Sequence, residues 1–183
     1  LVHSNAYLVG SELEDLGINL FQALHFSERE LQLIGDGRFI EIYCCRNLVT
    51  GAATAFRRSL LSVAQPFPDD WVHDEWLAAI ASSCGRVVML SESLLMYRQH
   101  GSNAIGVPKN VREYVSHGLR RIQDAPRSEF FAKRLRRLAF WLARLESLEG
   151  DYSAEKRHIQ GALEHFRSRS KMTVNPFDRF RII

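Results

Sequence analysis

Three polar clusters in the first 101 residues carry the residue types that a reactive site needs. Asp74 stands where a proline-bounded loop gives way to a helix, and from there a carboxylate can face a cleft and accept a proton. The imidazole of His100 has the chemistry to ligate a divalent cation or to hydrogen-bond a diphosphate. The three clusters, which we expect to meet at one site, are Thr50-Gly51, His73-Asp74 and Tyr97-Arg98-Gln99-His100-Gly101.

Each cluster also has a purely structural interpretation. Asp74 can stabilise the start of its helix, and Asp69 and Asp70 lie near enough in sequence to do the same. Thr50-Gly51 can simply begin a strand, and His100 can be an ordinary surface histidine. Spacing alone does not decide between these roles.

The elements expected to position these clusters alternate between strands and helices, so residues 1–107 are predicted to form an α/β unit. The helix over 71–84 has an apolar stripe that begins at Trp76 and ends before Gly85. Ser27 and Glu30 have the spacing of a capping box. The predicted strands cover 1–9, 48–56, 86–90 and 93–98, the predicted helices cover 19–34 in two pieces, 38–46, 58–64 and 71–84, and an acidic loop covers 10–17.

From residue 108 onward the pattern is helical only, so residues 108–183 are predicted to form an all-α C-terminal extension. The expected helices lie near 109–124, 128–148 and 152–169, with Ser128 and Ser153 as N-caps. The last two should pack as an antiparallel pair. Their expected contact residues are Phe131, Leu135, Leu138, Leu142 and Leu145 on one helix and Ile159, Leu163 and Phe166 on the other.

Composition narrows the functional classes. The 183 residues are 46% hydrophobic and 25% charged, as in ordinary globular proteins. They show neither a signal peptide nor an apolar run of the roughly 18 residues that could span a membrane. Three cysteines without a disulfide pattern predict reduced thiols and a cytoplasmic setting. The sequence also lacks P-loop, dinucleotide-binding glycine, G-x-S-x-G, H-E-x-x-H and paired C-x-x-C motifs.

The two predicted parts differ in charge. Residues 1–107 contain 7 basic and 12 acidic side chains and residues 108–183 contain 17 and 9, so net charges of −5 and +8 combine to the +3 of the whole chain. A basic run from Lys133 to Arg137 can contact anionic lipid headgroups or be the solvated face of a packed helix. No nucleic-acid-binding motif accompanies it, so nucleic acid is not expected as a partner. The aromatic residues around this run are Phe130, Phe131, Phe140 and Trp141.

Four motifs follow one another in residues 1–107: N-x-V-T-G-x-x-x-A-F-R-R from Asn47, P-F-P from Pro66, H-D-E-W from His73 and Y-R-Q-H-G from Tyr97. In this order and spacing they resemble the C-terminal half of bacterial family 2 glycosyltransferases, often rhamnosyl- or related sugar transferases of cell-surface polysaccharide synthesis. Because those enzymes have the GT-A fold, the resemblance implies a partial GT-A domain, its acceptor-side half, followed by the helical extension.

The resemblance implies roles for the residues that match these motifs. Asp74 would be the general base of an inverting transferase and would take the proton of an acceptor hydroxyl as its oxygen attacks the anomeric carbon. Thr50 and Gly51 would line the junction of donor and acceptor. His73 would orient a phosphate or the acceptor.

Of the residues that would contact the nucleotide diphosphate in the family, this sequence contains only some. Arg98 would offset the charge of the leaving nucleotide diphosphate, or it pairs with Glu92 instead. His100 would complete a Mg²⁺ or Mn²⁺ site that an Asp-x-Asp segment begins in the family, but this sequence does not contain that segment. Asn5 stands where many relatives have an aspartate, and no role is assigned to it.

We therefore expect the chain to belong to a longer protein and to be inactive alone. The resemblance implies a nucleotide-sugar donor and a saccharide or lipid-linked acceptor, used in the cytoplasm or at the inner face of the cell membrane. The alternative is a non-catalytic membrane-surface or protein-binding module derived from a glycosyltransferase, which would use the basic helices.

Overall fold

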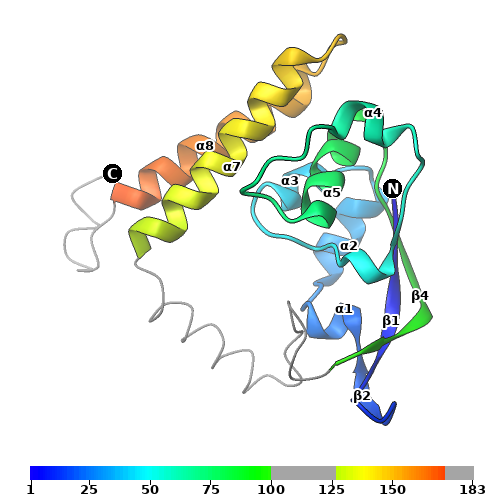
Figure 1. Ribbon diagram of the computed structural model, residues 1–183. Coiled ribbons are helices and arrows are strands. Elements are labelled where there is room, and N and C mark those ends of the chain that lie inside the picture. Colours follow the sequence, from blue (N-terminus) through cyan, green and yellow to red (C-terminus); the bar gives the residue numbers. More distant parts are fainter. Residues whose placement is uncertain (100–126, 172–183) are drawn as a thin grey trace. The chain divides into compact units, whose positions relative to one another are not determined.

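The computed structural model describes residues 1–99 and 127–171 of the chain, which divides into two compact units, Leu1–Arg121 and Ile122–Ile183. The described part of the first unit is mixed α/β, and that of the second is helical (Figure 1). The predicted succession of an α/β part and C-terminal helices is therefore confirmed. The predicted helix over 109–124 and the predicted boundary after residue 107 lie outside the described residues.

The first unit combines a small sheet with short helices. Its elements, in chain order, are β1 (Val2–Val9), β2 (Asp15–Asn19), α1 (Leu20–Ala23), α2 (Glu28–Gly35), α3 (Phe39–Tyr43), the 3₁₀ helix η1 (Gly51–Ala53), β3 (Thr54–Ala55), α4 (Leu60–Ala64), α5 (His73–Cys84) and β4 (Val88–Arg98).

β1 is the central strand of a four-stranded mixed sheet. β4 runs parallel to β1 along its whole length, from the pair Val2–Val88 to the pair Val9–Arg98. β2 and β3 are both antiparallel to β1 and share its other edge, with β2 beside the end of β1 and β3 beside its start. The first and last residues of β1 therefore mark the two ends of the sheet.

The sequence predicts two strands on either side of Ser91-Glu92, but β4 is a single bent strand (Figure 1). The pairing with β1 passes from Ser4–Leu90 directly to Asn5–Ser93, so Ser91-Glu92 form a bulge. The side-chain amide of Asn5 donates a hydrogen bond to the Ser91 carbonyl oxygen at 3.2 Å. Ser91 and Glu92, which in the sequence suggest a break between two strands, thus lie inside one strand as a bulge.

The predicted strand over 48–56 is wrong for most of its length. Of these residues, Thr54–Ala55 pair with β1, whereas Gly51–Ala53 form η1. The reason is that the Thr50 and Gly51 amides bond to side chains and not to a neighbouring strand. β2 was not predicted, because Asp15 and Gly17 are unfavourable strand residues and the alternation across them is weak.

The predicted helices of this unit are confirmed to within a few residues. The apolar stripe of α5 is buried, since Trp76 to Ala81 are all at most 4% exposed. The Trp76 indole N–H donates to the Ala64 carbonyl oxygen at 2.7 Å and ties α5 to α4. The predicted capping box at Ser27 and Glu30 is also present. Asn19 and Gln22 form a second one at the start of α1, which the sequence analysis did not predict.

Arg46 fixes the segment between α1 and α2. Its guanidinium donates to both carboxylate oxygens of Glu30 at 2.7 and 2.8 Å and to the carbonyl oxygens of Leu24 and His25 at 2.8 and 3.2 Å. The bond from Arg46 lowers the pKa of Glu30 from 4.5 to about 2. Because the pKa of Glu30 is lower in the folded than in the unfolded chain, the pair stabilises the fold at neutral pH and loses this effect as the pH falls from 4.5 toward 2.

Substitution of Arg46 by alanine is expected to lower the free energy of unfolding by about 1–2 kcal/mol at pH 7, after allowance for solvent screening of the half-buried guanidinium. The difference from wild type should shrink at pH 3. Denaturant titration at both pH values measures it. Arg38→Ala is the matched control, because the Arg38–Glu41 pair has the same 2.7 Å separation but Arg38 is 54% exposed. Equal losses in the two variants would contradict this role of Arg46.

The described part of the second unit is a pair of helices, α7 (Arg127–Ser147) and α8 (Ser153–Lys171). The ring of Phe131, near the start of α7, lies 6.3 Å from that of Phe166, near the end of α8, and Arg134 lies over the same Phe166 ring. The two helices are therefore antiparallel, as predicted (Figure 1). Their buried residues are Phe131, Leu138, Trp141 and Leu145 on α7 and Ile159, Ala162, Leu163 and Phe166 on α8.

The basic surface expected around Lys133 has fewer aromatic residues than the sequence suggests. Trp141 is fully buried and Phe131 is 6% exposed, because both belong to interior faces, whereas Phe130 and Phe140 are 56% and 43% exposed. None of the helices within residues 1–99 and 127–171 combines the length and apolarity needed to cross a bilayer.

The predicted N-caps of these helices are displaced. α7 begins at Arg127 and α8 at Ser153, so Ser128 and Ser153 lie inside the first turns. Asp151 accepts hydrogen bonds from the amide and the hydroxyl of Ser153. At α8 the acceptor for the first helical amide is therefore the carboxylate of Asp151, two residues before the helix, and Ser153 is a donor.

Candidate active site

Two of the three predicted clusters meet at the start of α5. The Gly51 amide donates a hydrogen bond to Asp74 Oδ2 at 2.7 Å, across 23 residues of sequence. The preceding amide, that of Thr50, donates to His3 Nε2 at 3.0 Å, across 47 residues. Asp74 is therefore held by the Thr50–Gly51 segment, which lies 23 residues before it in the sequence.

The Asp74 carboxylate is half-buried and well oriented. It belongs to the second residue of α5, where the helix dipole favours a negative charge. Its Oδ1 accepts from the Glu75 amide at 2.8 Å, while Oδ2 accepts from Gly51. The N-cap position itself belongs to Val72, so Asp74 is not the N-cap. Because each carboxylate oxygen can accept two hydrogen bonds, Oδ2 can still accept a hydroxyl proton.

Gly51 is required at this point for space and not for backbone conformation. A Cβ atom added to it would lie 3.1 Å from Asp74 Oδ2 and 3.3 Å from His73 Nε2. Its φ angle lies outside the left-handed region that favours glycine. The same geometry places His73, whose side chain is exposed, beside the Gly51–Asp74 bond.

Gly51→Ala is expected to displace the Asp74 carboxylate by a few tenths of an ångström. If Asp74 is a catalytic base, the rate it supports should fall roughly 10–100-fold, because catalysis is sensitive to small errors in position. The free energy of unfolding should change by less than about 1 kcal/mol. Gly35→Ala is the control, because a Cβ there meets nothing within 4 Å. Equal activity of both variants would contradict the importance of this close approach.

His3 belongs to the same cluster, although the sequence analysis gave it no role. It is fully buried in β1, and its ring stacks on that of Phe21 at a centroid distance of 5.8 Å. Burial lowers the pKa of His3 to about 4, and the nearby negative charge of Asp74 acts in the opposite direction. The imidazole is therefore neutral at pH 7. The available signal was three consecutive polar residues, His3, Ser4 and Asn5, within a predicted strand.

Asn5 is a second buried polar residue that sequence reasoning left without a role. Its Oδ1 accepts from the amides of Ala6 and Phe21 at 2.9 and 3.0 Å, and its Nδ2 donates to Ser91. One side chain thus joins β1, the start of α1 and the bulge of β4. It therefore holds β1, which carries His3, to α1 and β4.

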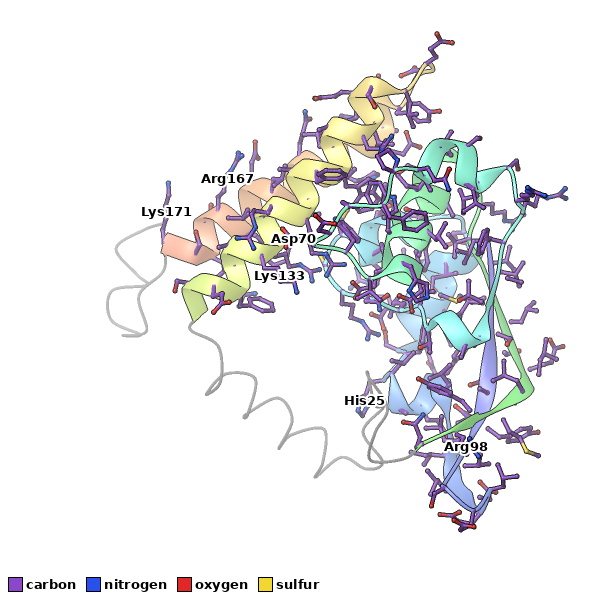
Figure 2. All side chains as sticks on the ribbon, in the orientation of Figure 1. His25, Asp70, Arg98, Lys133, Arg167 and Lys171 are labelled. Carbon is purple, nitrogen blue, oxygen red and sulfur yellow. The ribbon has the colours of Figure 1, made fainter. Side chains whose placement is uncertain are left out.

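The structure does not bring Arg98 to Asp74. Arg98 pairs in register with Val9, at the end of β1 opposite to His3. Six residues of strand correspond to about 20 Å. Figure 2 shows Arg98 at one end of the sheet, and Figure 1 shows the N-terminus at the other. Any function of Arg98 therefore lies at the far end of the sheet, and His100 lies outside the described residues.

The described residues do not fit a metal site at Asp74. Within 1–99 and 127–171, no three His, Cys, Asp or Glu side chains gather where they could hold a metal ion. Both oxygens of Asp74 accept backbone hydrogen bonds. What this arrangement can do chemically is accept a proton from a bound hydroxyl.

Comparison with protein-family models, with curated proteins and with solved structures finds no match to this chain. Two features of the chain therefore bear on its function: the geometry at Asp74 and the order of the motifs in the sequence.

Proposed function

We propose that this chain is the acceptor-side half of an inverting, nucleotide-sugar-dependent glycosyltransferase with a GT-A fold. The observation that carries the proposal is the hydrogen bond between Gly51 and Asp74, because it joins two of the motifs on which the resemblance depends. A base must be held in one orientation beside its substrate, and a backbone donor from a second segment achieves this. The mixed sheet with its covering helices is compatible with such a half-domain.

In the proposed reaction, Asp74 Oδ2 accepts a hydrogen bond from the acceptor hydroxyl. The hydroxyl oxygen attacks the anomeric carbon from the face opposite the nucleotide, and its proton passes to Oδ2. The bond between the anomeric carbon and the diphosphate oxygen breaks, and its electron pair leaves with the nucleoside diphosphate. One displacement inverts the anomeric configuration. General-base assistance of this kind contributes about 10²–10⁴ to the rate.

The neighbouring residues have supporting roles in this proposal. Gly51 gives the acceptor room to approach Oδ2, because no side chain projects from it. His73 is exposed beside the same atoms and can donate a hydrogen bond to the acceptor or a phosphate oxygen. Thr50 contributes backbone, since its amide is bonded to His3.

The donor side is proposed to lie outside the described residues. A Mg²⁺ or Mn²⁺ ion would offset the charge of the diphosphate when bound, but the described residues do not form its site, and no step above involves it. A role for Arg98 at the diphosphate would require the donor to reach the Val9 end of the sheet. The proposed acceptor is a saccharide or lipid-linked saccharide of a cell-surface polysaccharide.

Calorimetric titration with UDP, dTDP and GDP in the presence of Mn²⁺ tests this function, on the 183-residue chain and on the full product of its gene. We expect the full product to bind one nucleotide and the chain alone to bind it far more weakly or not at all. Binding of one nucleotide would identify the donor class. Absence of binding to both proteins would contradict the proposal.

A second candidate is a non-catalytic module that contacts an anionic membrane surface. It is favoured by the exposure of Phe130 and Phe140 on α7, on either side of the exposed Lys133. Figure 2 labels Lys133 on α7 and Arg167 and Lys171 on α8. Salt-sensitive sedimentation with phosphatidylserine vesicles, together with no nucleotide binding, would favour this candidate over the transferase.

A further inference from the structure

His3 has a hydrogen-bonding environment that stability alone does not explain. Its Nε2 accepts the Thr50 amide at 3.0 Å, so the proton of the neutral imidazole must be on Nδ1. Nδ1 is buried and finds no hydrogen-bond partner within the described part of the chain. The residue therefore makes one good hydrogen bond and leaves one buried donor unsatisfied.

Taken together, the hydrogen bond at Nε2 and the unsatisfied donor at Nδ1 do not stabilise the folded state. An unsatisfied buried donor costs more free energy than one hydrogen bond contributes on balance. An apolar side chain of similar volume would avoid that cost in a fully buried position. Residues that break a local rule in this way are expected at functional sites. What His3 provides in return is an acceptor for the Thr50 amide.

Thr50 and Gly51 connect His3 to Asp74 through one peptide unit. Their consecutive N–H groups are bonded in turn to His3 and to Asp74. The Thr50 carbonyl oxygen is fixed as well, because it accepts from the Thr54 hydroxyl at 2.9 Å. The Ala53 amide donates to the same oxygen at 3.0 Å. Because Thr50 and Gly51 are adjacent in the backbone, we expect loss of the Thr50–His3 bond to shift the Gly51 N–H relative to the carboxylate.

We propose that His3 is a positioning residue for Asp74: its Nε2 anchors the Thr50–Gly51 backbone, which holds the carboxylate in the orientation that receives the acceptor proton. This inference rests on the proposed function of Asp74. It assigns a purpose to the unsatisfied Nδ1, since the tautomer that accepts from Thr50 necessarily carries its proton there. The neutral state of the ring near pH 7 agrees with this purpose, because a proton on Nε2 would face the Thr50 N–H.

Three substitutions separate the acceptor from the volume of the side chain. His3→Gln carries an oxygen to about the place of Nε2, His3→Asn carries one to about the place of Nδ1, and His3→Leu fills the space without an acceptor. Amide hydrogen exchange in the 183-residue chain, followed by NMR, reports on each N–H separately. The Ile80 amide in the buried part of α5 serves as the reference.

We expect His3→Leu and His3→Asn to accelerate exchange of the Thr50 and Gly51 amides about tenfold more than that of Ile80. His3→Gln should stay within about threefold of wild type at all three amides. A merely structural role would change the three amides together and would not be rescued by glutamine. Unchanged exchange at Gly51, or equal acceleration at Ile80, overturns the proposal. Should His3→Leu fail to fold, His3→Gln and His3→Asn give the same decision.

The same variants have a kinetic consequence in the full gene product. His3→Leu and His3→Asn should lower kcat roughly tenfold with little change in the KM of the acceptor, and His3→Gln should restore most of it. An unchanged kcat in all three would overturn the proposal. If the wild-type protein transfers no sugar, the proposed function of Asp74 fails by itself, whereas the exchange experiment still decides whether His3 positions the carboxylate.

Discussion

Asp74→Asn is expected to lower the rate of sugar transfer by about 10²–10⁴-fold and to leave the fold intact. The asparagine carbonyl oxygen can still accept the Gly51 amide, so the 2.7 Å bond to the Thr50–Gly51 segment can be kept, whereas the asparagine NH2 group cannot accept from the Glu75 amide as Oδ1 does. An amide oxygen, however, cannot take a proton from the acceptor. The free energy of unfolding should therefore fall by only about 1–2 kcal/mol, from the lost Glu75 bond and the lost first-turn charge, which is a small effect beside the loss of activity.

Asp69→Asn is the control for this experiment, because Asp69 is an exposed carboxylate five residues before Asp74. It removes the same charge from the loop just before α5 and should leave transfer unchanged. Steady-state kinetics and denaturant unfolding of both variants, in the full gene product, measure the two effects separately. Full activity of Asp74→Asn would show that the carboxylate serves only to join Gly51 to α5.

Asn5→Ala is expected to have a large effect on stability, a loss of about 3–4 kcal/mol in the free energy of unfolding. The side chain makes three hydrogen bonds to backbone groups, and its removal leaves the Ala6 and Phe21 amides without their acceptor. Asn5 is 5% exposed, so water cannot readily replace the lost partner. Denaturant titration of the 183-residue chain measures this loss.

Two further substitutions sharpen this prediction. Asn5→Asp keeps the acceptor oxygen but turns a second, charged oxygen toward the Ser91 carbonyl oxygen in a buried position. Its loss at pH 7 should therefore be at least as large as that of Asn5→Ala and should shrink at low pH, where a protonated carboxyl group can donate to Ser91. Asn47→Ala also removes bonds to backbone, but Asn47 is exposed and bonds only locally to Val49, so its effect should be about 1 kcal/mol or less. Equal losses for Asn5→Ala and Asn47→Ala would contradict the central position of Asn5.

Elements set by local signals could be predicted from the sequence. The apolar stripe of α5 and the capping box at Ser27 each depend on residues within a few positions of one another. The antiparallel pairing of α7 and α8 follows from their own apolar periodicity and from the short loop that joins them. The expectation that Thr50-Gly51 and His73-Asp74 meet also agrees with the structure, although their chemical roles stay predictions.

Features set by distant partners could not be predicted in this way. The strand expected over 48–56 gives way to η1 because its amides find His3 and Asp74, which lie far away in sequence. The bulge that unites β4 depends on Asn5 of β1. Trp141 has the spacing of an aromatic residue beside a basic surface, yet it is fully buried. In each case a tertiary contact overrides the local pattern.

In the proposed reaction, Asp74 is the one base of a single displacement at the anomeric carbon. The most direct test is the anomeric configuration of the transferred sugar, read from its ¹H NMR coupling constant early in the reaction of the full gene product with a nucleotide-sugar. A single displacement with Asp74 as its base should give the configuration opposite to that of the donor. Transfer with the donor's configuration retained would contradict the role of Asp74 as the base of a single displacement.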